Sequence, residues 1–124
     1  MKRKITHACL CLAATALLGA CGQKEVSFSA DVQPILKKYC LECHVQGGEG
    51  QVKSGLLMAD YEGLMKGTQF GPIIKPGNTL ESVLVQLIEG RANPAITMPH
   101  GREAMPAEAT ATLKKWVEQG AKKN

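Results

Sequence analysis

Hydrophobic residues recur at helical spacing in a first stretch of the chain, residues 27–43. The apolar stripe of this stretch consists of Val32, Ile35, Leu36 and Tyr39. Ser29 or Asp31 can cap its start, and Pro34 favours Asp31, because proline is harmless only in the first turn of a helix. We therefore expect one continuous helix that ends at Cys43.

The clearest helical pattern of the chain covers residues 79–89. Asn78 and Glu81 have the spacing of a capping box, and Gly90 follows as a stop signal. Its apolar residues follow the i, i+3, i+4, i+7, i+8 pattern of an amphipathic helix: Leu80, Val83, Leu84, Leu87 and Ile88. We expect these five side chains to face inward.

Two further helices have clear start and stop signals. Asp60 caps a short helix over residues 61–66, and Gly67 ends it. Pro106 opens the last helix in its first turn, and Gly120 ends that helix. The inward stripe of the last helix consists of Ala109, Leu113, Trp116 and Val117.

The segments between these helices carry loop signals. Residues 46–55 are rich in glycine and predict a flexible loop, while prolines and glycines keep residues 70–77 extended. Residues 91–101 form a third loop, and residues 122–124 predict a frayed, solvated tail. No strand is predicted, so the expected class is all-α.

Residues 1–20 have the features of an export signal. A basic start precedes an apolar run over residues 8–18 that is too short to span a membrane, and small residues precede Cys21. This pattern resembles the lipobox of bacterial lipoproteins. We expect Cys21 to be acylated and followed by a short polar tether over residues 21–26, so that the domain proper covers residues 27–121.

An ordinary signal peptide with a chance cysteine is the alternative for this segment. Either interpretation places the protein outside the cytoplasm, on the periplasmic face. Gly22 stands where an aspartate would resemble an inner-membrane retention signal. The outer membrane is therefore favoured over the inner one.

Processing changes the charge of the chain. Removing residues 1–20 removes three of the 15 basic residues and none of the 11 acidic ones, so the formal charge falls from +4 to +1. The basic balance thus belongs mostly to the discarded segment. It gives no support for nucleic-acid binding.

The sequence from Cys40 to His44 reads Cys-Leu-Glu-Cys-His, the attachment pattern of a c-type haem. In this chemistry Cys40 and Cys43 form thioethers with the two vinyl groups of one covalent haem c, and His44 supplies an axial ligand to the iron. A redox disulfide and half of a zinc site are the alternatives. No second Cys-x-x-Cys or His-x-x-x-His pair follows that would complete four zinc ligands.

An electron-transfer haem with six ligands needs a second axial residue. Met98 is favoured, because it lies on a loop between two helices and Pro99 stiffens the backbone that presents it. Met105 also precedes a proline but stands at a helix start, and His100 lies only two residues from Met98. Both remain open as the sixth ligand.

These motifs and several shorter ones resemble the planctomycete-type cytochrome c domain over residues 27–121. The matching segments are 28–36, 40–44, 75–78, 82–84, 98–99 and 116–121. Two positions depart from the family pattern: His100 stands where proline is more frequent, and Met105 stands where leucine is common.

The resemblance implies an all-α class I cytochrome c fold with three main helices around one haem. It implies that His44 is the proximal ligand and Met98 the distal ligand of the iron. It also implies that the carbonyl of Pro72 accepts a hydrogen bond from the ring of His44 and orients it.

The expected function is therefore that of a membrane-anchored monohaem c-type cytochrome that carries single electrons, not that of an enzyme. We expect transient redox protein partners, a membrane contact through the lipid anchor, no nucleic acid, and a monomer. The alternative is a haem-based sensor in which a small molecule displaces the sixth ligand.

Overall fold

Short helices make up the fold of residues 22–124, which is the part of the chain that the computed structural model describes. In chain order they are η1 (Phe28–Val32), α1 (Gln33–Tyr39), α2 (Glu49–Ser54), α3 (Tyr61–Lys66), α4 (Val83–Ile88), η2 (Pro94–Ile96) and α5 (Ala107–Glu118). No strand occurs among these residues, where the only β-type pairing is an isolated bridge between Thr68 and Gly71. The predicted all-α class is confirmed.

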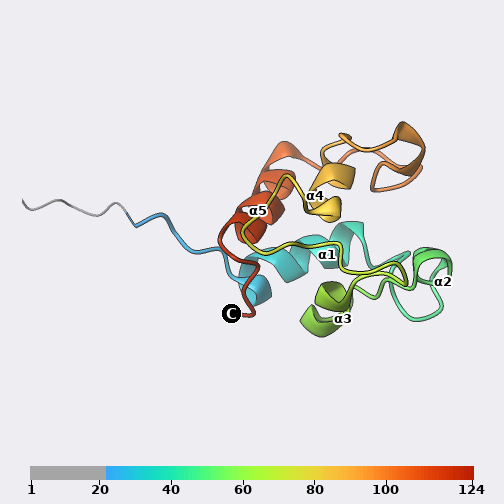
Figure 1. Cartoon of the computed structure of the whole chain (residues 1–124), viewed down its shortest axis with the longest axis horizontal. Helices are drawn as coiled ribbons and strands as arrows, with labels where there is room; N and C mark the ends of the chain where they lie inside the picture. The colour runs from blue at the N-terminus through green and yellow to red at the C-terminus, as the bar shows by residue number, and fades with distance from the viewer. Residues whose placement is uncertain (1–21) are drawn as a thin grey trace, which may run out of the picture.

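The core forms where α5 packs against η1 and α4 (Figure 1). Leu113, Trp116 and Val117 of α5 are buried, as the predicted inward stripe requires. The ring centroid of Trp116 lies 5.6 Å from that of Phe28 in η1, and Phe28 lies 5.2 Å edge-on from Tyr61 in α3. This aromatic cluster joins three segments that are far apart in the sequence, and aromatic rings bury more apolar area than other side chains.

The single helix predicted over residues 27–43 is wrong in its cap and its end. Ser27 is the cap: its hydroxyl accepts a hydrogen bond from the N–H three residues on, and its own N–H donates to the Asp31 carboxylate at 2.9 Å. Because the helix starts earlier than predicted, Pro34 lies inside the segment, where it has no N–H to donate. The hydrogen-bond pattern changes at this point from the π-helix η1 to the α-helix α1. The helix ends before Cys40, which begins a turn.

The helix predicted over residues 79–89 begins later, at Val83. The Asn78 side chain accepts from the Glu81 N–H at 3.0 Å, as a capping box requires, but a turn follows instead of a helix. The fully buried Ser82 explains this turn, since its hydroxyl donates to the Asn78 carbonyl at 2.6 Å and so holds the chain in a tight bend.

The inward face of α4 differs accordingly from the prediction. Leu80 precedes the helix and is 74% exposed, so its predicted burial is wrong. Leu84 is buried as predicted, and Val85 is buried although the periodicity did not include it. Leu87 and Ile88 line a cavity that is described below.

Residues 46–55, predicted as a flexible loop, contain α2. The Gln51 N–H in the first turn of α2 donates to the carbonyl of Cys43 at 3.0 Å, so the helix starts on the preceding turn. Gly55, with φ of 78°, ends it. A six-residue helix with an internal glycine is unstable alone. The local sequence pattern does not show that α2 is attached to the preceding turn, and for this reason it did not predict the helix.

The helix α3 has the predicted bounds, and α5 begins one residue after the predicted start. The Asp60 side chain accepts from the backbone at 2.7 Å and caps α3, which Gly67 ends with φ of 81°. Pro106 directly precedes α5, and Gly120 follows it with φ of 102°. Both predictions succeed because the signals at each end are local.

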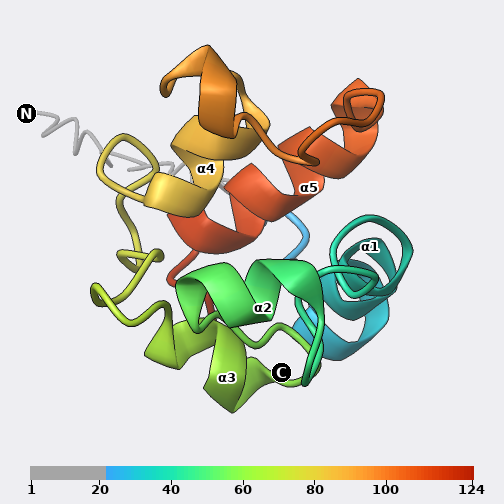
Figure 2. The same ribbon diagram turned by 90° about the vertical axis from the view of Figure 1, so that its right-hand side faces the viewer.

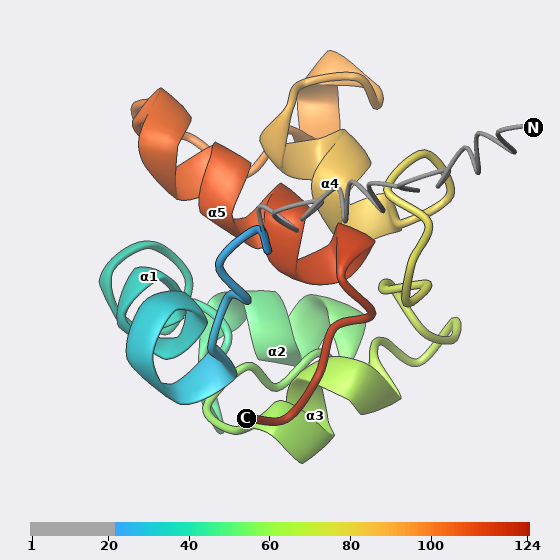
Figure 3. The same ribbon diagram turned by 90° about the vertical axis from the view of Figure 1, so that its left-hand side faces the viewer.

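The prediction of a frayed tail at residues 122–124 is wrong. The Tyr61 hydroxyl donates to the carbonyl of Ala121 at 2.8 Å, and the Trp116 indole N–H donates to the carbonyl of Lys122 at 2.9 Å. Buried aromatic donors need acceptors, and the tail supplies them. Figure 3 shows the N-terminal segment, in blue, and the last residues, in dark red, on the same side of the fold.

The predicted export signal over residues 1–20 and the predicted acylation site, Cys21, lie outside the described residues. Within residues 22–124, no helix combines the length and the apolar character needed to cross a membrane.

We expect Glu89→Gln to lower the melting temperature at neutral pH but not in acid. Glu89 pairs with Lys114 at 2.7 Å and with Arg91 at 2.5 Å, and these two cations, Lys114 first, hold the pKa of Glu89 below its usual value. A carboxylate whose pKa is lower in the folded than in the unfolded state stabilises the fold at pH values above its unfolded-state pKa. This stabilisation is lost as the pH falls through its folded-state pKa. The expected loss at pH 7 is about 1 kcal/mol for this partly buried pair of contacts.

Thermal unfolding of the intact protein at about pH 7 and about pH 3 measures this difference. Glu103→Gln is the matched control, because Glu103 forms no ion pair within the described part of the chain. An equal loss for Glu89→Gln at both pH values would contradict the assignment to these ion pairs.

Candidate functional site: a cavity between two thiols, an imidazole and a thioether

A cavity of about 600 Å³ separates two parts of the fold. Its lining residues come from the turn after α1 and the helix α2, and from α4, η2 and the loop that follows them. Figure 2 shows α1 and α2 in the lower part of the fold and α4 and the orange loop in the upper part, so the two groups form opposite walls. Most of the lining side chains are apolar: Leu56, Met58, Ile73, Val83, Leu84, Leu87, Ile88, Ile96, Met98 and Met105. The volume lies within the range of about 300–1,000 Å³ that is typical of cofactor pockets.

Cys40 and Cys43 line this cavity from the turn after α1. The carbonyl of Cys40 accepts hydrogen bonds from the N–H groups of Cys43, at 3.2 Å, and His44, at 3.0 Å, so the turn holds all three residues at one edge. Within the described part of the chain, neither cysteine forms a disulfide, and both are free thiols. Burial, with a smaller effect of Cys43, raises the pKa of Cys40 to about 11, so Cys40 is protonated at neutral pH and resists oxidation.

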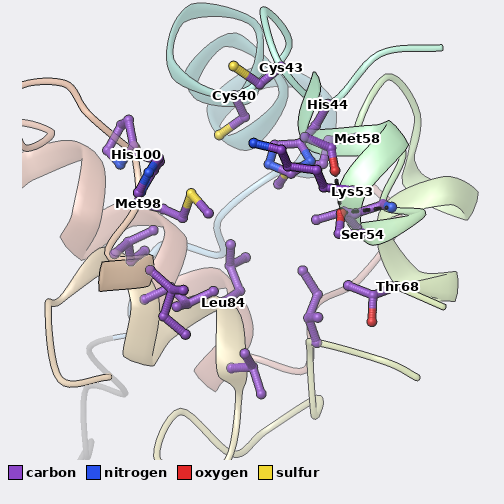
Figure 4. A pocket seen from close by; sticks show the side chains of 18 of the residues that line it. Cys40, Cys43, His44, Lys53, Ser54, Met58, Thr68, Leu84, Met98 and His100 are labelled. Atoms are coloured by element: carbon purple, nitrogen blue, oxygen red, sulfur yellow. Dashed lines mark hydrogen bonds between the residues drawn. The ribbon is translucent and has the colours of Figure 1, made fainter. Parts of the chain in front are cut away.

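The His44 ring projects into the cavity beside the two cysteines (Figure 4). Its Nδ1 atom is buried and has no hydrogen-bond partner among residues 22–124. Burial lowers the pKa of His44, and the nearby backbone of Leu56 opposes this shift only in part. The ring is therefore neutral at physiological pH, which is the form in which imidazole binds a metal.

The implied hydrogen bond from His44 to the Pro72 carbonyl is not formed. Pro72 lines the cavity, but the buried Nδ1 has no partner, and the backbone group that affects the pKa of His44 is that of Leu56. A tertiary hydrogen bond explains the difference: the Met58 N–H donates to the His44 carbonyl at 2.9 Å and brings residues 56–58 alongside the imidazole.

Gly50 of α2 packs directly against the His44 ring, and the sequence pattern missed this role. A Cβ atom at residue 50 would lie 2.7 Å from His44 Cε1 and 2.9 Å from both ring nitrogens. Real Cβ contacts are not that short, so the close approach of α2 to the imidazole requires glycine. The glycine-rich run after His44 contains this residue, but the run was interpreted as a flexible loop and not as a site of close packing.

We expect Gly50→Ala to displace the His44 ring even though alanine favours a helix. The added methyl group must push α2 or the imidazole away, which weakens the contact on one side of the cavity. The expected results are a loss of roughly 1–3 kcal/mol of stability, seen as a lower melting temperature, and a shifted absorption spectrum of the haem that the sequence predicts. Val52→Ala is the control, since Val52 lies on the same helix and is 70% exposed. An unchanged spectrum in Gly50→Ala would contradict the packing role.

Met98 lies on the opposite wall, and its sulfur is directed across the cavity toward His44 (Figure 4). The Met98 N–H donates to the carbonyl of Leu87 at 3.2 Å, which ties the loop to the end of α4. His100 lies beside Met98 on the same wall, and the buried Met105 also lines the cavity. The fold thus brings all three predicted candidates for the sixth ligand to one cavity.

An ion pair that the sequence did not reveal joins the two walls. Arg102 of the loop that carries Met98 pairs with Glu42, which lies between the two cysteines. Both side chains are largely exposed, so the pair contributes little to stability. It shows that the loop and the turn after α1 meet at the cysteine end of the cavity.

The residues around the cavity fit a covalently attached haem. Two free thiols, a neutral imidazole with an unpartnered ring nitrogen, and a thioether face one apolar space of suitable size. A zinc site fits poorly, because residues 22–124 contain no cluster of three or more His, Cys, Asp or Glu side chains placed to hold a metal ion.

Comparison with known proteins agrees with this geometry. Residues 40–100 match the family model described as Planctomycete cytochrome C. No match was found among curated proteins or among solved structures. The matched segment begins at Cys40, includes His44 and Met98, and ends at His100. Over residues 40–100, the chain therefore carries a domain of the planctomycete cytochrome c family.

Proposed function

We propose that this protein is a monohaem c-type cytochrome that carries single electrons between redox proteins. A cytochrome c domain implies electron transfer by haem, and the observation that carries the proposal here is the convergence of Cys40, Cys43, His44 and Met98 on one cavity. When bound, haem c supplies a one-electron ferric/ferrous couple. The chain supplies the attachment, the axial ligands and an apolar environment.

Each residue has a distinct part in this proposal. Cys40 and Cys43 hold the cofactor through thioether bonds, and His44 provides the proximal ligand as a neutral imidazole. Met98 provides the distal ligand from the opposite wall, which is the side that its sulfur faces. A thioether ligand raises the reduction potential relative to two imidazoles, and the apolar lining raises it further by disfavouring the more highly charged ferric state.

A potentiometric titration of the purified cytochrome tests the carrier function. We expect one reversible wave with the slope of a single electron, and complete reoxidation by a soluble oxidant. Catalytic turnover of hydrogen peroxide, or a slope that requires more than one electron, would contradict a simple monohaem carrier.

A haem-based sensor is the second candidate, and the loop that carries Met98 supports it. No residue from 91 to 104 is buried, so few packing contacts hold Met98 in place. A small molecule such as carbon monoxide could then replace Met98 on the iron. Rapid formation of a carbon monoxide complex by the reduced protein favours the sensor, while inertness favours the carrier.

The proposed location rests on the N-terminal sequence. Acylation of Cys21 would place the domain on the periplasmic face of a membrane, with the outer membrane favoured by Gly22. We expect wild-type protein in the membrane fraction with the mass of an acylated N-terminus. Cys21→Ser should instead release a soluble cytochrome, and a membrane-bound Cys21→Ser variant would contradict the lipid anchor.

A further inference from the structure

Residues 119–124, which we call the clamp, hold the N-terminal segment on the fold. The Val26 N–H donates to Gln119 Oε1 at 2.8 Å, and Gln119 Nε2 donates to the carbonyl of Lys24 at 3.1 Å. Lys122 pairs with Glu25 at 2.5 Å. The segment predicted as a short polar tether is therefore fixed from Lys24 onward.

Asn124 completes the clamp on the following residues. Its Oδ1 accepts from the Phe28 N–H at 2.8 Å, and its backbone oxygen accepts from the Ser29 N–H at 3.0 Å. Phe28 is buried in the aromatic cluster, so these hydrogen bonds connect the N-terminal segment to the core.

The clamp and the cavity lie on opposite sides of the fold. In Figure 1 the N-terminal segment and the last residues lie at one end of the molecule, while α2 and the loop of residues 91–104 lie at the other. The cavity is lined by α2 and by that loop, and by no residue of the clamp. The chain therefore leaves the fold on the side away from the haem-binding residues.

We propose that the clamp fixes how the anchored domain stands on the membrane, with the cavity opening away from the lipid surface toward a water-soluble redox protein. This inference rests on the proposed acylation of Cys21. Only Gly22 and Gln23 separate Cys21 from the first clamped residue, Lys24, a reach of about 10 Å. A domain of about 100 residues is about 30 Å across, so this tether is too short to let the far side reach the bilayer.

The exposed apolar side chains agree with a protein partner at the cavity. Phe70 is 88% exposed, Ile96 is 51% exposed and Val83 is 41% exposed, and all three line the cavity. Haem in the cavity would cover part of these side chains, and the apolar surface that stays exposed at its edge would mark a contact surface for another protein. A partner that approaches from water meets this surface directly, whereas a partner embedded in the same bilayer faces the clamp.

Thiol labelling of the full, haem-loaded lipoprotein tests this orientation. Val52→Cys places a thiol on α2 at the cavity end, and Lys123→Cys places one on the clamp side; both side chains are exposed. In the loaded, acylated protein Cys21, Cys40 and Cys43 are all consumed, so each variant has one free thiol. The probe is a polyethylene glycol maleimide, applied on vesicles of phosphatidylethanolamine and phosphatidylglycerol and, for comparison, to the soluble Cys21→Ser forms.

We expect the membrane to leave the labelling rate of Val52→Cys unchanged and to slow that of Lys123→Cys several-fold. Slowing of Val52→Cys to the same or a greater degree would overturn the orientation. Failure of the wild-type lipoprotein to bind the vesicles would overturn the anchor, and the orientation with it, so the two failures are distinguishable.

A second variant tests the role of the clamp itself. Replacing Gln119 and Asn124 by alanine removes the side-chain hydrogen bonds to Lys24, Val26 and Phe28. The backbone oxygen of residue 124 still holds Ser29, and the exposed ion pair of Lys122 with Glu25 contributes little, so the free tether lengthens to about six residues, or about 20 Å. We expect the labelling difference between the two positions to shrink. Gln46→Ala is the control, since Gln46 is an exposed glutamine outside the clamp. A labelling difference that persists unchanged in the double variant, with an intact haem spectrum, would overturn the clamp as its cause.

Discussion

Replacing Cys40 and Cys43 together by alanine is expected to abolish covalent haem attachment completely. The two sulfur atoms are the only groups at the cavity that can form thioethers, because residues 22–124 contain no other cysteine. The measurement is haem staining of the denatured protein on a gel, where only covalently bound haem remains with the chain. Each single variant is expected to keep one thioether and to retain reduced staining.

Loss of the cofactor should also unfold much of the domain. The apolar side chains that line the cavity of about 600 Å³ would then face water, which costs roughly 1.5–3 kcal/mol for each side chain that the haem fully covers. A few such side chains amount to much of the stability of an ordinary domain, about 5–15 kcal/mol. Cys21→Ala is the matched control, since it removes a cysteine outside the cavity and should leave haem staining intact. Full staining of the double variant would contradict the attachment sites.

Met98→Ala is expected to remove the weak red absorption band of a methionine–iron bond and to lower the reduction potential. The Met98 sulfur is the thioether that faces His44 across the cavity, and a methionine ligand raises the potential of a c-type haem. The ferric and ferrous absorption spectra, with a redox titration, measure both effects. The variant should also bind carbon monoxide, because the sixth coordination position is then open.

Three control variants separate ligation from packing. Met58→Leu and Met105→Leu keep most of the side-chain volume at two buried methionines that line the cavity, and His100→Ala removes the other candidate ligand. We expect all three to retain the red band. Loss of the band in Met105→Leu with retention in Met98→Ala would reassign the sixth ligand to Met105.

The sequence alone predicted those parts of the fold that are determined by residues close together in the chain. Asp60 and Gly67 bound α3 because a cap and a left-handed glycine act within their own turn. Cys40, Cys43 and His44 were recognisable because covalent chemistry demands a fixed spacing. In each case, residues a few positions apart carry the whole signal.

The parts that failed depend on contacts between distant residues. Gly50 looked like a flexible glycine, and only its position against the His44 ring reveals a packing requirement. The tail at residues 122–124 looked frayed, but the indole of Trp116 and the backbone of the N-terminal segment hold it. No periodicity or capping rule encodes such contacts, because the partners are set by the tertiary fold.

The central claim, a six-coordinate haem held by His44 and Met98 for electron transfer, is tested most directly by one absorption measurement. The mature protein, made with haem-attachment machinery, is recorded oxidised, reduced, and reduced under carbon monoxide. We predict a low-spin spectrum with the weak red band in the oxidised form and no change with carbon monoxide. A high-spin spectrum, or rapid conversion to a carbon monoxide complex, would contradict the carrier and support a haem-based sensor.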